Sequence, residues 1–308
     1  MGYAFIFAGQ GSQSAGMGRE FYENFSVCRE LLQNASEYLR IDFENLLFSE
    51  NEKLSISEFT QPAIVLSSLM AYEALKQSLN LEPKFSLGHS LGEFSALAVS
   101  GAFSYFNALK IVNLRGRFMQ EACEGKDAGM MVVLGLNDAL VEQICADARK
   151  QGLQIYAANY NCDGQIVVAG VRADLAKFES IFKEAGAKRA MLLNMSVASH
   201  CPILVSASER LVVELEKNLA DSFAPVISNV SAKVYTSKSD ALNLLKDQLV
   251  KPVLYKQSIK TYEDGIECFI ELGTNTLKGI NKKVTDKPTF SITDMPSLEE
   301  AVKNLESR

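Results

Sequence analysis

Residues 84–88, KFSLG, are typical of a short strand and continue directly into the pentapeptide GHSLG at 88–92 and then into a helical segment that Gly101 ends. A Gly-x-Ser-x-Gly sequence between a strand and a helix is typical of a nucleophile elbow, a sharp turn that lifts the serine hydroxyl clear of the backbone. The sequence therefore indicates a strand, an elbow at Ser90 and a helix. The alternative is an ordinary strand–turn–helix junction in which Ser90 caps the helix.

Short apolar strands and longer amphipathic helices alternate on both sides of this turn, which predicts a parallel sheet covered by helices. In the helix at 60–77, Pro62 is tolerated if it lies in the first turn, where its missing N–H has no partner to lose. We expect strands or extended segments at 3–9, 225–236 and 267–273, and helices at 60–77, 104–124, 202–219, 238–249, 253–265 and 296–306.

The middle of the chain has a different order of elements. Residues 130–136 are strand-like, and two further strands within 153–170 are joined by a turn that contains Asp163 and Gly164. With helices at 137–152 and 171–186 and a last strand at 188–196, the order is β-α-β-β-α-β, a ferredoxin-like unit. We predict that this unit, residues 127–196, is inserted into a larger α/β domain formed by 1–126 and 197–308, with a ligand cleft between them.

Composition excludes several classes of protein. The net charge of −6 argues against a nucleic-acid binder, and no apolar run approaches the roughly 20 residues of a membrane span. The first residues lack a basic segment, so a secretory signal peptide is not expected. The six cysteines are scattered without a C-x-x-C pair, which favours neither a zinc site nor a disulfide framework. We expect a cytoplasmic protein with reduced thiols.

A serine hydroxyl needs a base, and the chain has two histidines. His89 directly precedes Ser90, so its side chain leaves the turn in another direction and is expected to pack or hydrogen bond beside it. His200 is therefore the candidate base. A third, acidic member is not evident, because most acids between Ser90 and His200 fall inside the predicted insertion; we expect a Ser-His dyad oriented by a neutral acceptor. The backbone N–H of Leu91 is the expected oxyanion donor.

Six peptides occur in the order and approximate spacing of one family. The chain resembles the malonyl-CoA:acyl-carrier-protein transacylases of type II fatty acid synthesis and the related acyltransferase domains of polyketide synthases. The resemblance covers nearly the whole chain and implies an α/β-hydrolase-like large domain with a ferredoxin-like insertion. The peptides are FAGQGSQ (7–13), TQPA (60–63), GHSLGE (88–93), LRGRFMQE (114–121), SVASH (196–200) and QLVKPV (248–253).

Site roles follow from the resemblance position by position. It makes Ser90 the nucleophile that becomes malonylated and His200 its general base. The backbone N–H of Gln10 would complete the oxyanion hole with that of Leu91, and the glycines on both sides of Gln10 would permit a close approach.

The resemblance also supplies a carboxylate-binding residue, Arg115. A guanidinium offers two parallel donors to a carboxylate, although an arginine on a helix is by itself usually a surface group. Arg117 cannot share the same helix face, and the family pattern selects Arg115. Gln248 aligns with the residue that accepts a hydrogen bond from the histidine, through either its side chain or its backbone.

The implied function is transfer of malonyl from malonyl-CoA to the phosphopantetheine thiol of acyl carrier protein, in a ping-pong cycle without metal or redox cofactor. The alternatives are a serine hydrolase or thioesterase with the same dyad, a polyketide-type acyltransferase, and a non-catalytic carrier-binding relative. Acyl carrier proteins are acidic, so docking requires a local basic patch on this acidic chain. Candidates, against the alternative of ordinary solvated side chains, are Lys188 with Arg189, and Lys278, Lys282 and Lys283.

Overall fold

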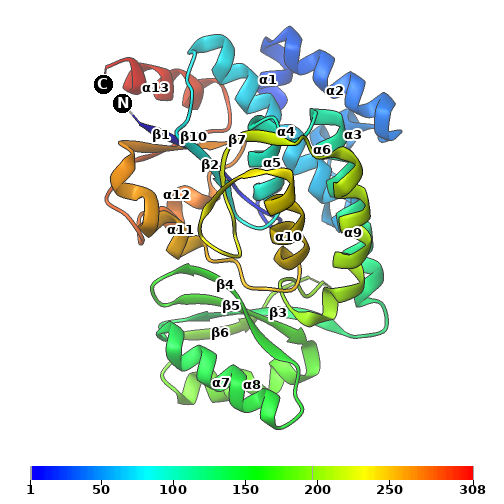
Figure 1. The fold of residues 1–308 in the computed structure, drawn as a ribbon, viewed down its shortest axis with the longest axis vertical. Helices are drawn as coiled ribbons and strands as arrows, with labels where there is room; N and C mark the ends of the chain where they lie inside the picture. Colours follow the sequence, from blue (N-terminus) through cyan, green and yellow to red (C-terminus); the bar gives the residue numbers. More distant parts are fainter. Residues whose placement is uncertain (1, 196, 308) are drawn as a thin grey trace.

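The computed structural model describes residues 2–195 and 197–307, which form a larger part around one sheet and a smaller part around another (Figure 1). The larger part carries a mostly parallel six-stranded sheet, and the smaller part carries an antiparallel four-stranded sheet. The predicted fold class, an α/β domain with a parallel sheet and an inserted α+β unit, is confirmed.

The six-stranded sheet has the order β10-β9-β1-β2-β7-β8, in which β8 alone runs antiparallel to its neighbour. The edge strand β10 was not among the strands that the sequence predicted. The strands are β1 (Tyr3–Phe7), β2 (Phe85–Gly88), β7 (Ser222–Ile227), β8 (Val234–Ser237), β9 (Cys268–Leu272) and β10 (Thr289–Ile292).

Both faces of this sheet are covered because successive side chains of a strand point to opposite faces. In β1, Phe5 and Phe7 pack into the large core on one face, and Ala4 and Ile6 pack into a smaller core on the other. The smaller core is closed by α11 (Tyr255–Tyr262) and α12 (Thr276–Asn281). The large core is closed by α1 (Arg19–Asn24), α2 (Ser26–Leu39), α3 (Phe43–Phe48), α4 (Ser57–Ser78), α5 (Gly92–Val99), α6 (Tyr105–Cys123), α9 (Val205–Asn218), α10 (Lys238–Gln248) and α13 (Met295–Glu306).

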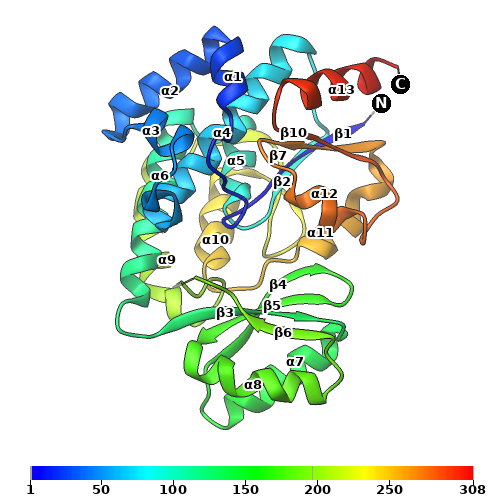
Figure 2. The ribbon, with the colours of Figure 1, turned by 180° about the vertical axis from the view of Figure 1, so that it is seen from behind.

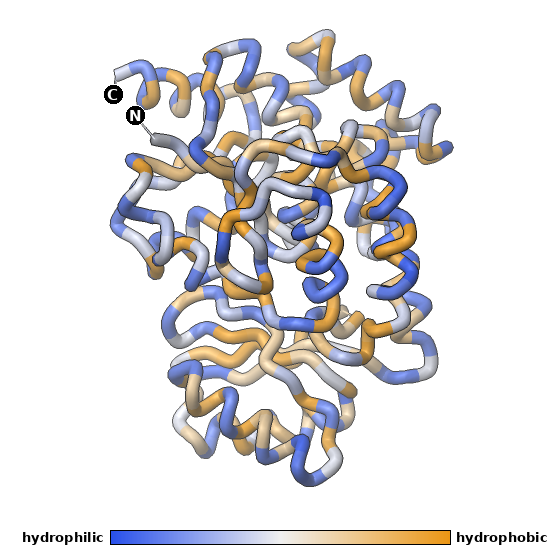
Figure 3. The backbone as a smooth tube through the Cα atoms, in the orientation of Figure 1, coloured by the Kyte–Doolittle hydropathy of each residue, from blue (hydrophilic) through white to orange (hydrophobic). Residues whose placement is uncertain are grey.

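Outer helices of the larger part bury one side only. In α9, hydrophilic and hydrophobic residues alternate along the helix (Figure 3), and Ala207, Leu211 and Leu215 recur every fourth residue on the buried side. Of residues 2–195 and 197–307, no helix has both the length and the apolar character that are needed to cross a bilayer.

Helix α4 begins at Ser57, three residues before the predicted start, so Pro62 lies in its second turn rather than its first. The prediction that Pro62 lies in the first turn of the helix is therefore wrong. A proline at this point leaves the carbonyl of Glu58 without its helical donor. That carbonyl accepts instead from the side-chain amide of Asn113 in α6, at 2.8 Å. The helix continues because a neighbouring helix replaces the hydrogen bond that proline cannot make.

The smaller part consists of β3 (Ala128–Leu134), α7 (Asp138–Lys150), β4 (Ile155–Cys162), β5 (Gln165–Val171), α8 (Arg172–Glu184) and β6 (Arg189–Leu192). The sheet order is β4-β5-β3-β6, the order of elements is the predicted β-α-β-β-α-β, and the turn between β4 and β5 is the predicted pair Asp163 and Gly164. Helices α7 and α8 cover the face that points away from the larger part (Figure 2).

The last strand of the smaller part is shorter than expected. β6 ends at Leu192, and the chain then turns, with the N–H of Met195 donating to the carbonyl of Leu193 at 2.9 Å. Ser196, the last residue of the predicted insertion, lies outside the described residues. The division of the chain at 127 and 196 stays a prediction.

Candidate active site

Ser90 lies in a tight turn between β2 and α5, with φ +54°, in the left-handed region that non-glycine residues seldom adopt. The flanking glycines have no space for a side chain. A Cβ on Gly88 would lie 1.8 Å from the carbonyl carbon of Gly92, and a Cβ on Gly92 would lie 2.0 Å from the carbonyl oxygen of Phe7. Helix α5 has no side-chain cap, so the alternative in which Ser90 caps the helix is not observed.

Gly92→Ala is expected to lower the free energy of unfolding by about 3 kcal/mol or more, because the new methyl meets backbone rather than a movable side chain. Thermal unfolding followed by circular dichroism measures the effect. Gly279→Ala in α12 is the matched control: a Cβ there meets nothing within 4 Å, so the variant is expected to be as stable as the parent or slightly more so. Equal melting temperatures for Gly92→Ala and the parent would contradict the packing described for the elbow.

The structure brings His200 and Gln248 to Ser90. His200 Nε2 lies 2.7 Å from Ser90 Oγ, and His200 Nδ1 lies 2.6 Å from the backbone carbonyl oxygen of Gln248. Because a carbonyl only accepts, Nδ1 carries the proton and Nε2 is free to accept from the serine hydroxyl. The orienting group is thus a neutral backbone acceptor. His200, like Ser90, has a left-handed backbone, with φ +62°.

His200 is 2% exposed, and its surroundings keep the imidazole uncharged. Burial, followed by the nearby Arg115 guanidinium, lowers the pKa of His200 to about 3. The ring is therefore neutral at physiological pH, which is the form that can accept a proton.

Arg115 reaches the same serine from α6 and is 1% exposed. Its Nη2 donates to Ser90 Oγ at 3.3 Å and to Gln248 Oε1 at 3.2 Å, while Nη1 donates to Gln61 Oε1 at 2.9 Å. Burial lowers the pKa of Arg115 to about 9, so the group still carries its charge at neutral pH. Arg117 is exposed and lies 3.8 Å from Glu121, on another face of the helix.

The predicted oxyanion residues lie at the elbow. Leu91 directly follows Ser90 and is fully buried. The loop that contains Gln10 packs directly against the elbow, because a Cβ on Gly9 would lie 2.5 Å from the carbonyl oxygen of His89. The side chain of Gln10 bonds to two neighbours: Nε2 donates to Ser57 Oγ at 2.8 Å, and Oε1 accepts from Gln61 Nε2 at 3.3 Å.

Gln10 also lines a cleft of about 590 Å³ between the two parts of the molecule. The walls come from the loop after β1, the start of α4 and helix α6 in the larger part, and from the start of α8 and the segment that follows β6. The lining residues are Gln10, Gly11, Gln13, Ser55, Ile56, Ser57, Gln120, Arg172, Leu193, Asn194, Met195 and Val197.

His89 makes the neighbouring contact that the sequence favoured. Its Nε2 lies 2.7 Å from Asn161 Oδ1, and its ring lies 5.5 Å from that of Tyr255. The contact with Asn161, in β4, ties the elbow to the smaller part.

Three buried residues of the site were missed at the sequence level. Asn229 accepts from the Ser90 N–H at 2.7 Å and donates to the Gly88 carbonyl at 2.6 Å, so one amide brackets the elbow. Glu93 and Gln61 lie behind Gln248 and Arg115. Their signals were present: Glu93 and Gln61 belong to the peptides GHSLGE and TQPA, and Asn229 follows a strand at the carboxyl edge of a parallel sheet.

The predicted basic side chains are all exposed and lie in two places. Lys188 and Arg189 lie on the smaller part at the start of β6, and Lys278, Lys282 and Lys283 lie in and after α12.

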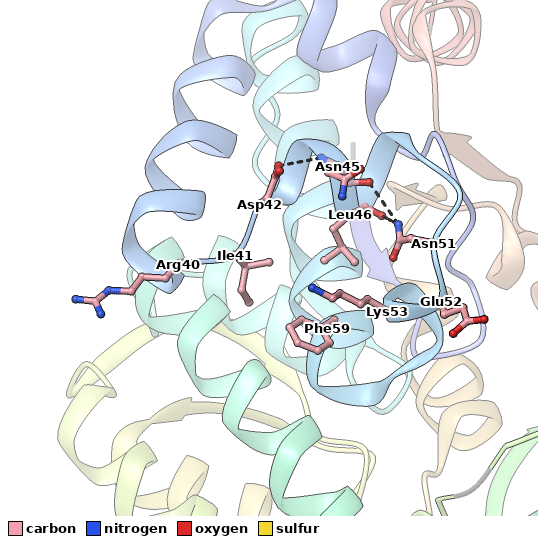
Figure 4. Close-up of a pocket in the computed structure, with 9 residues that line it drawn as sticks. All are labelled: Arg40, Ile41, Asp42, Asn45, Leu46, Asn51, Glu52, Lys53 and Phe59. Carbon is pink, nitrogen blue, oxygen red and sulfur yellow. Dashed lines mark hydrogen bonds between the residues drawn. The ribbon is translucent and has the colours of Figure 1, made fainter.

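A separate pocket of about 390 Å³ lies near α3 and the start of α4 (Figure 4). None of the predicted site residues lines it; the lining residues are Arg40, Ile41, Asp42, Asn45, Leu46, Asn51, Glu52, Lys53 and Phe59.

Comparison with known proteins shows which family this chain belongs to. Residues 4–289 match the acyl transferase domain family. The chain belongs to this family. Members with similar sequences include the malonyl CoA-acyl carrier protein transacylase of Bacillus subtilis, which is 38% identical over 307 residues and is matched over 98% of this chain and 96% of its own length.

Solved acyltransferase structures agree with the same assignment. The malonyl-CoA:acyl carrier protein transacylase of Helicobacter pylori superposes with a TM-score of 0.96 at 45% identity, over 99% of both chains. A malonyl-transacylase in complex with a type II polyketide acyl-carrier protein superposes with a TM-score of 0.94 at 32% identity, over 99% of this chain and 100% of the other. The family resemblance predicted from the peptides is confirmed.

Proposed function

We propose that this acyltransferase moves a malonyl group from malonyl-CoA to the phosphopantetheine thiol of acyl carrier protein, through an ester on Ser90. The observation that carries the proposal is the position of Ser90 Oγ, 2.7 Å from His200 Nε2 and 3.3 Å from Arg115 Nη2. A hydroxyl beside a neutral base and a buried guanidinium fits attack on an acyl group that ends in a carboxylate.

In the first half of the cycle, His200 Nε2 takes the Ser90 proton as Oγ attacks the thioester carbonyl. The Gln248 carbonyl, 2.6 Å from Nδ1, holds the ring in the required tautomer and faces the charge that develops on it. The backbone N–H groups of Leu91 and Gln10 are the proposed donors to the oxyanion. The carbon–sulfur bond breaks, the CoA thiolate takes the proton from His200, and malonyl-Ser90 remains.

In the second half, the carrier thiol gives its proton to His200 and attacks the ester carbonyl. The ester bond to Ser90 Oγ breaks, Oγ recovers the proton from His200, and the malonyl thioester of the carrier leaves. All steps use one base and one oxyanion site, so the same geometry serves both directions.

Arg115 distinguishes this proposal from a general ester hydrolase. A fully buried guanidinium is costly unless all its donors find partners. Its Nε is buried without a hydrogen-bond partner in the described part of the chain, so the protein leaves the guanidinium only partly satisfied. We assign the malonyl carboxylate to Arg115 because a charged acceptor best compensates such a group.

The carrier would approach the cleft between the two parts. Lys188 with Arg189, and Lys278, Lys282 and Lys283, are the proposed contacts for an acidic carrier, since both sets are exposed. Similar proteins are named for action on malonyl-CoA and acyl carrier protein, and one similar structure contains a carrier. These names support the choice of donor and acceptor.

Hydrolysis is the competing outcome, and one experiment separates the two. The protein is incubated with malonyl-CoA, with and without holo acyl carrier protein, and followed by intact mass and by release of free malonate. A stable adduct on Ser90 that the carrier then discharges is expected. Equal malonate release with and without carrier would instead identify a hydrolase, and the absence of any acyl-enzyme would identify a non-catalytic relative.

A further inference from the structure

Three hydrogen-bond donors converge on the side chain of Glu93, which is 1% exposed at the start of α5. Tyr235 Oη donates to Oε1 at 2.8 Å, and Gln248 Nε2 and the backbone N–H of Asn229 donate to Oε2 at 2.7 and 3.2 Å. An ionised carboxylate is acceptor-only and satisfies all three donors. Burial raises the pKa of Glu93, while these donors and the Arg115 charge oppose that rise.

The amide of Gln248 lies between Glu93 and Arg115. Its Oε1 accepts from Arg115 Nη2 at 3.2 Å, and its Nε2 donates to Glu93 and, at 3.0 Å, to the carbonyl oxygen of Ser90. Arginine can only donate and a carboxylate can only accept, so Glu93 allows one orientation of the amide. If the amide were reversed, its NH2 group would face the N–H donor of Arg115, and its oxygen would face the acceptor oxygen of Glu93.

In this arrangement the negative charge of Glu93 lies near the Arg115 guanidinium without bonding to it directly. Among the ion pairs of the described residues, Glu93 and Arg115 are not joined directly, because the Gln248 amide separates them. With the amide between them, Arg115 Nη2 stays 3.3 Å from Ser90 Oγ.

We propose that Glu93 is a positioning residue for the transfer: its carboxylate holds the Gln248 amide with Oε1 toward Arg115, and this orientation directs Arg115 to acyl groups that end in a carboxylate. The inference rests on the proposed malonyl transfer and concerns its selectivity. Glu93 acts through Gln248 and touches no reacting atom.

The test is Glu93→Leu, which has a similar size but removes both acceptor oxygens; Glu93→Gln would not serve, because its amide oxygen could still accept from Gln248 Nε2 while its NH2 donates to Tyr235 Oη. The readout is kcat/KM for malonyl-CoA divided by kcat/KM for acetyl-CoA, which does not depend on the fraction of folded enzyme. The ratio is expected to fall about 10-fold or more, as for a lost hydrogen bond to a charged group. Tyr235→Phe is the control: it removes the donor to Oε1 but keeps Gln248 on Oε2, and its ratio should stay within about 3-fold of the parent.

A double-mutant cycle tests the route. Gln248→Leu alone should lower the ratio as well, and adding Glu93→Leu to it should cause no further loss, because Glu93 acts only through Gln248. An unchanged ratio in Glu93→Leu, or additive losses in the double variant, would overturn the inference. If Glu93→Leu does not fold, an unchanged ratio in Gln248→Leu overturns it equally.

The parent protein separates this inference from the proposed function. A parent that forms no malonyl adduct overturns the proposed function, and the inference with it. A parent that prefers malonyl-CoA while Glu93→Leu keeps the same ratio overturns the inference alone.

Discussion

Ser90→Ala is expected to abolish the malonyl adduct and to lower the transfer rate by about 10⁴-fold or more, the order found when a nucleophile is removed from a serine–histidine site. The reason is geometric: Oγ is the atom that both His200 Nε2 and Arg115 Nη2 approach, at 2.7 and 3.3 Å. Intact mass after exposure to malonyl-CoA measures the adduct, and a discontinuous assay with holo carrier protein measures the rate.

Ser95→Ala is the matched control for this variant. Ser95 lies in the same helix as Glu93, is fully buried, and its hydroxyl has no hydrogen-bond partner in the described structure. Removing that hydroxyl is expected to leave the adduct stoichiometric. A stoichiometric malonyl adduct on Ser90→Ala would refute Ser90 as the acyl carrier and require another nucleophile.

Arg115→Ala is expected to lower kcat/KM for malonyl-CoA by about 10² to 10³, since truncating one partner of a buried charged pair costs about 2–5 kcal/mol. Acetyl-CoA has no carboxylate to lose, so its kcat/KM should change much less and the selectivity should collapse. Arg115→Lys retains the charge without the fork and is expected to be intermediate. Competition between the two thioesters, scored by intact mass, gives the ratio directly.

Arg117→Ala provides the comparison two residues along the same helix. Its side chain is 45% exposed and pairs with Glu121 at 3.8 Å, an exposed contact that contributes little. Selectivity should equal that of the parent. Unchanged malonyl/acetyl selectivity in Arg115→Ala would remove the carboxylate role from Arg115.

Most of the fold was predictable because its signals are local. Strand–helix alternation, the elbow glycines and the β-α-β-β-α-β order depend on residues near one another in sequence. Helices α1, α2 and α3 were not predicted, and two further features have no local signal. β10 is a short edge strand whose place depends on pairing with β9, and the start of α4 depends on Asn113, 55 residues from Glu58, which satisfies the carbonyl that Pro62 leaves open.

The residues of the candidate site also fall into those that the sequence identified and those that it did not. Ser90 and His200 were selected by histidine scarcity and the elbow, and Arg115 by family resemblance. The structure places His200 and Arg115 within hydrogen-bond distance of Ser90 Oγ. Glu93 and Asn229 stand at positions with a sequence signal but were not assigned, since their importance comes from contacts that span 155 and 139 residues. A buried polar network is a tertiary property, and no local pattern encodes its partners.

The order of strands in the large sheet has a consequence for synthesis on the ribosome. β1 and β2 are made early and pair with each other, but their outer neighbours β9 and β7 are made only after the smaller part. Until then the nascent β1–β2 pair exposes two open edges, the kind of surface on which chains aggregate. Asn229 and Gln248, which brace Ser90, also emerge late. Ser90 is therefore synthesised long before the residues that fix its position. We expect the nascent chain to depend most on chaperones during that interval.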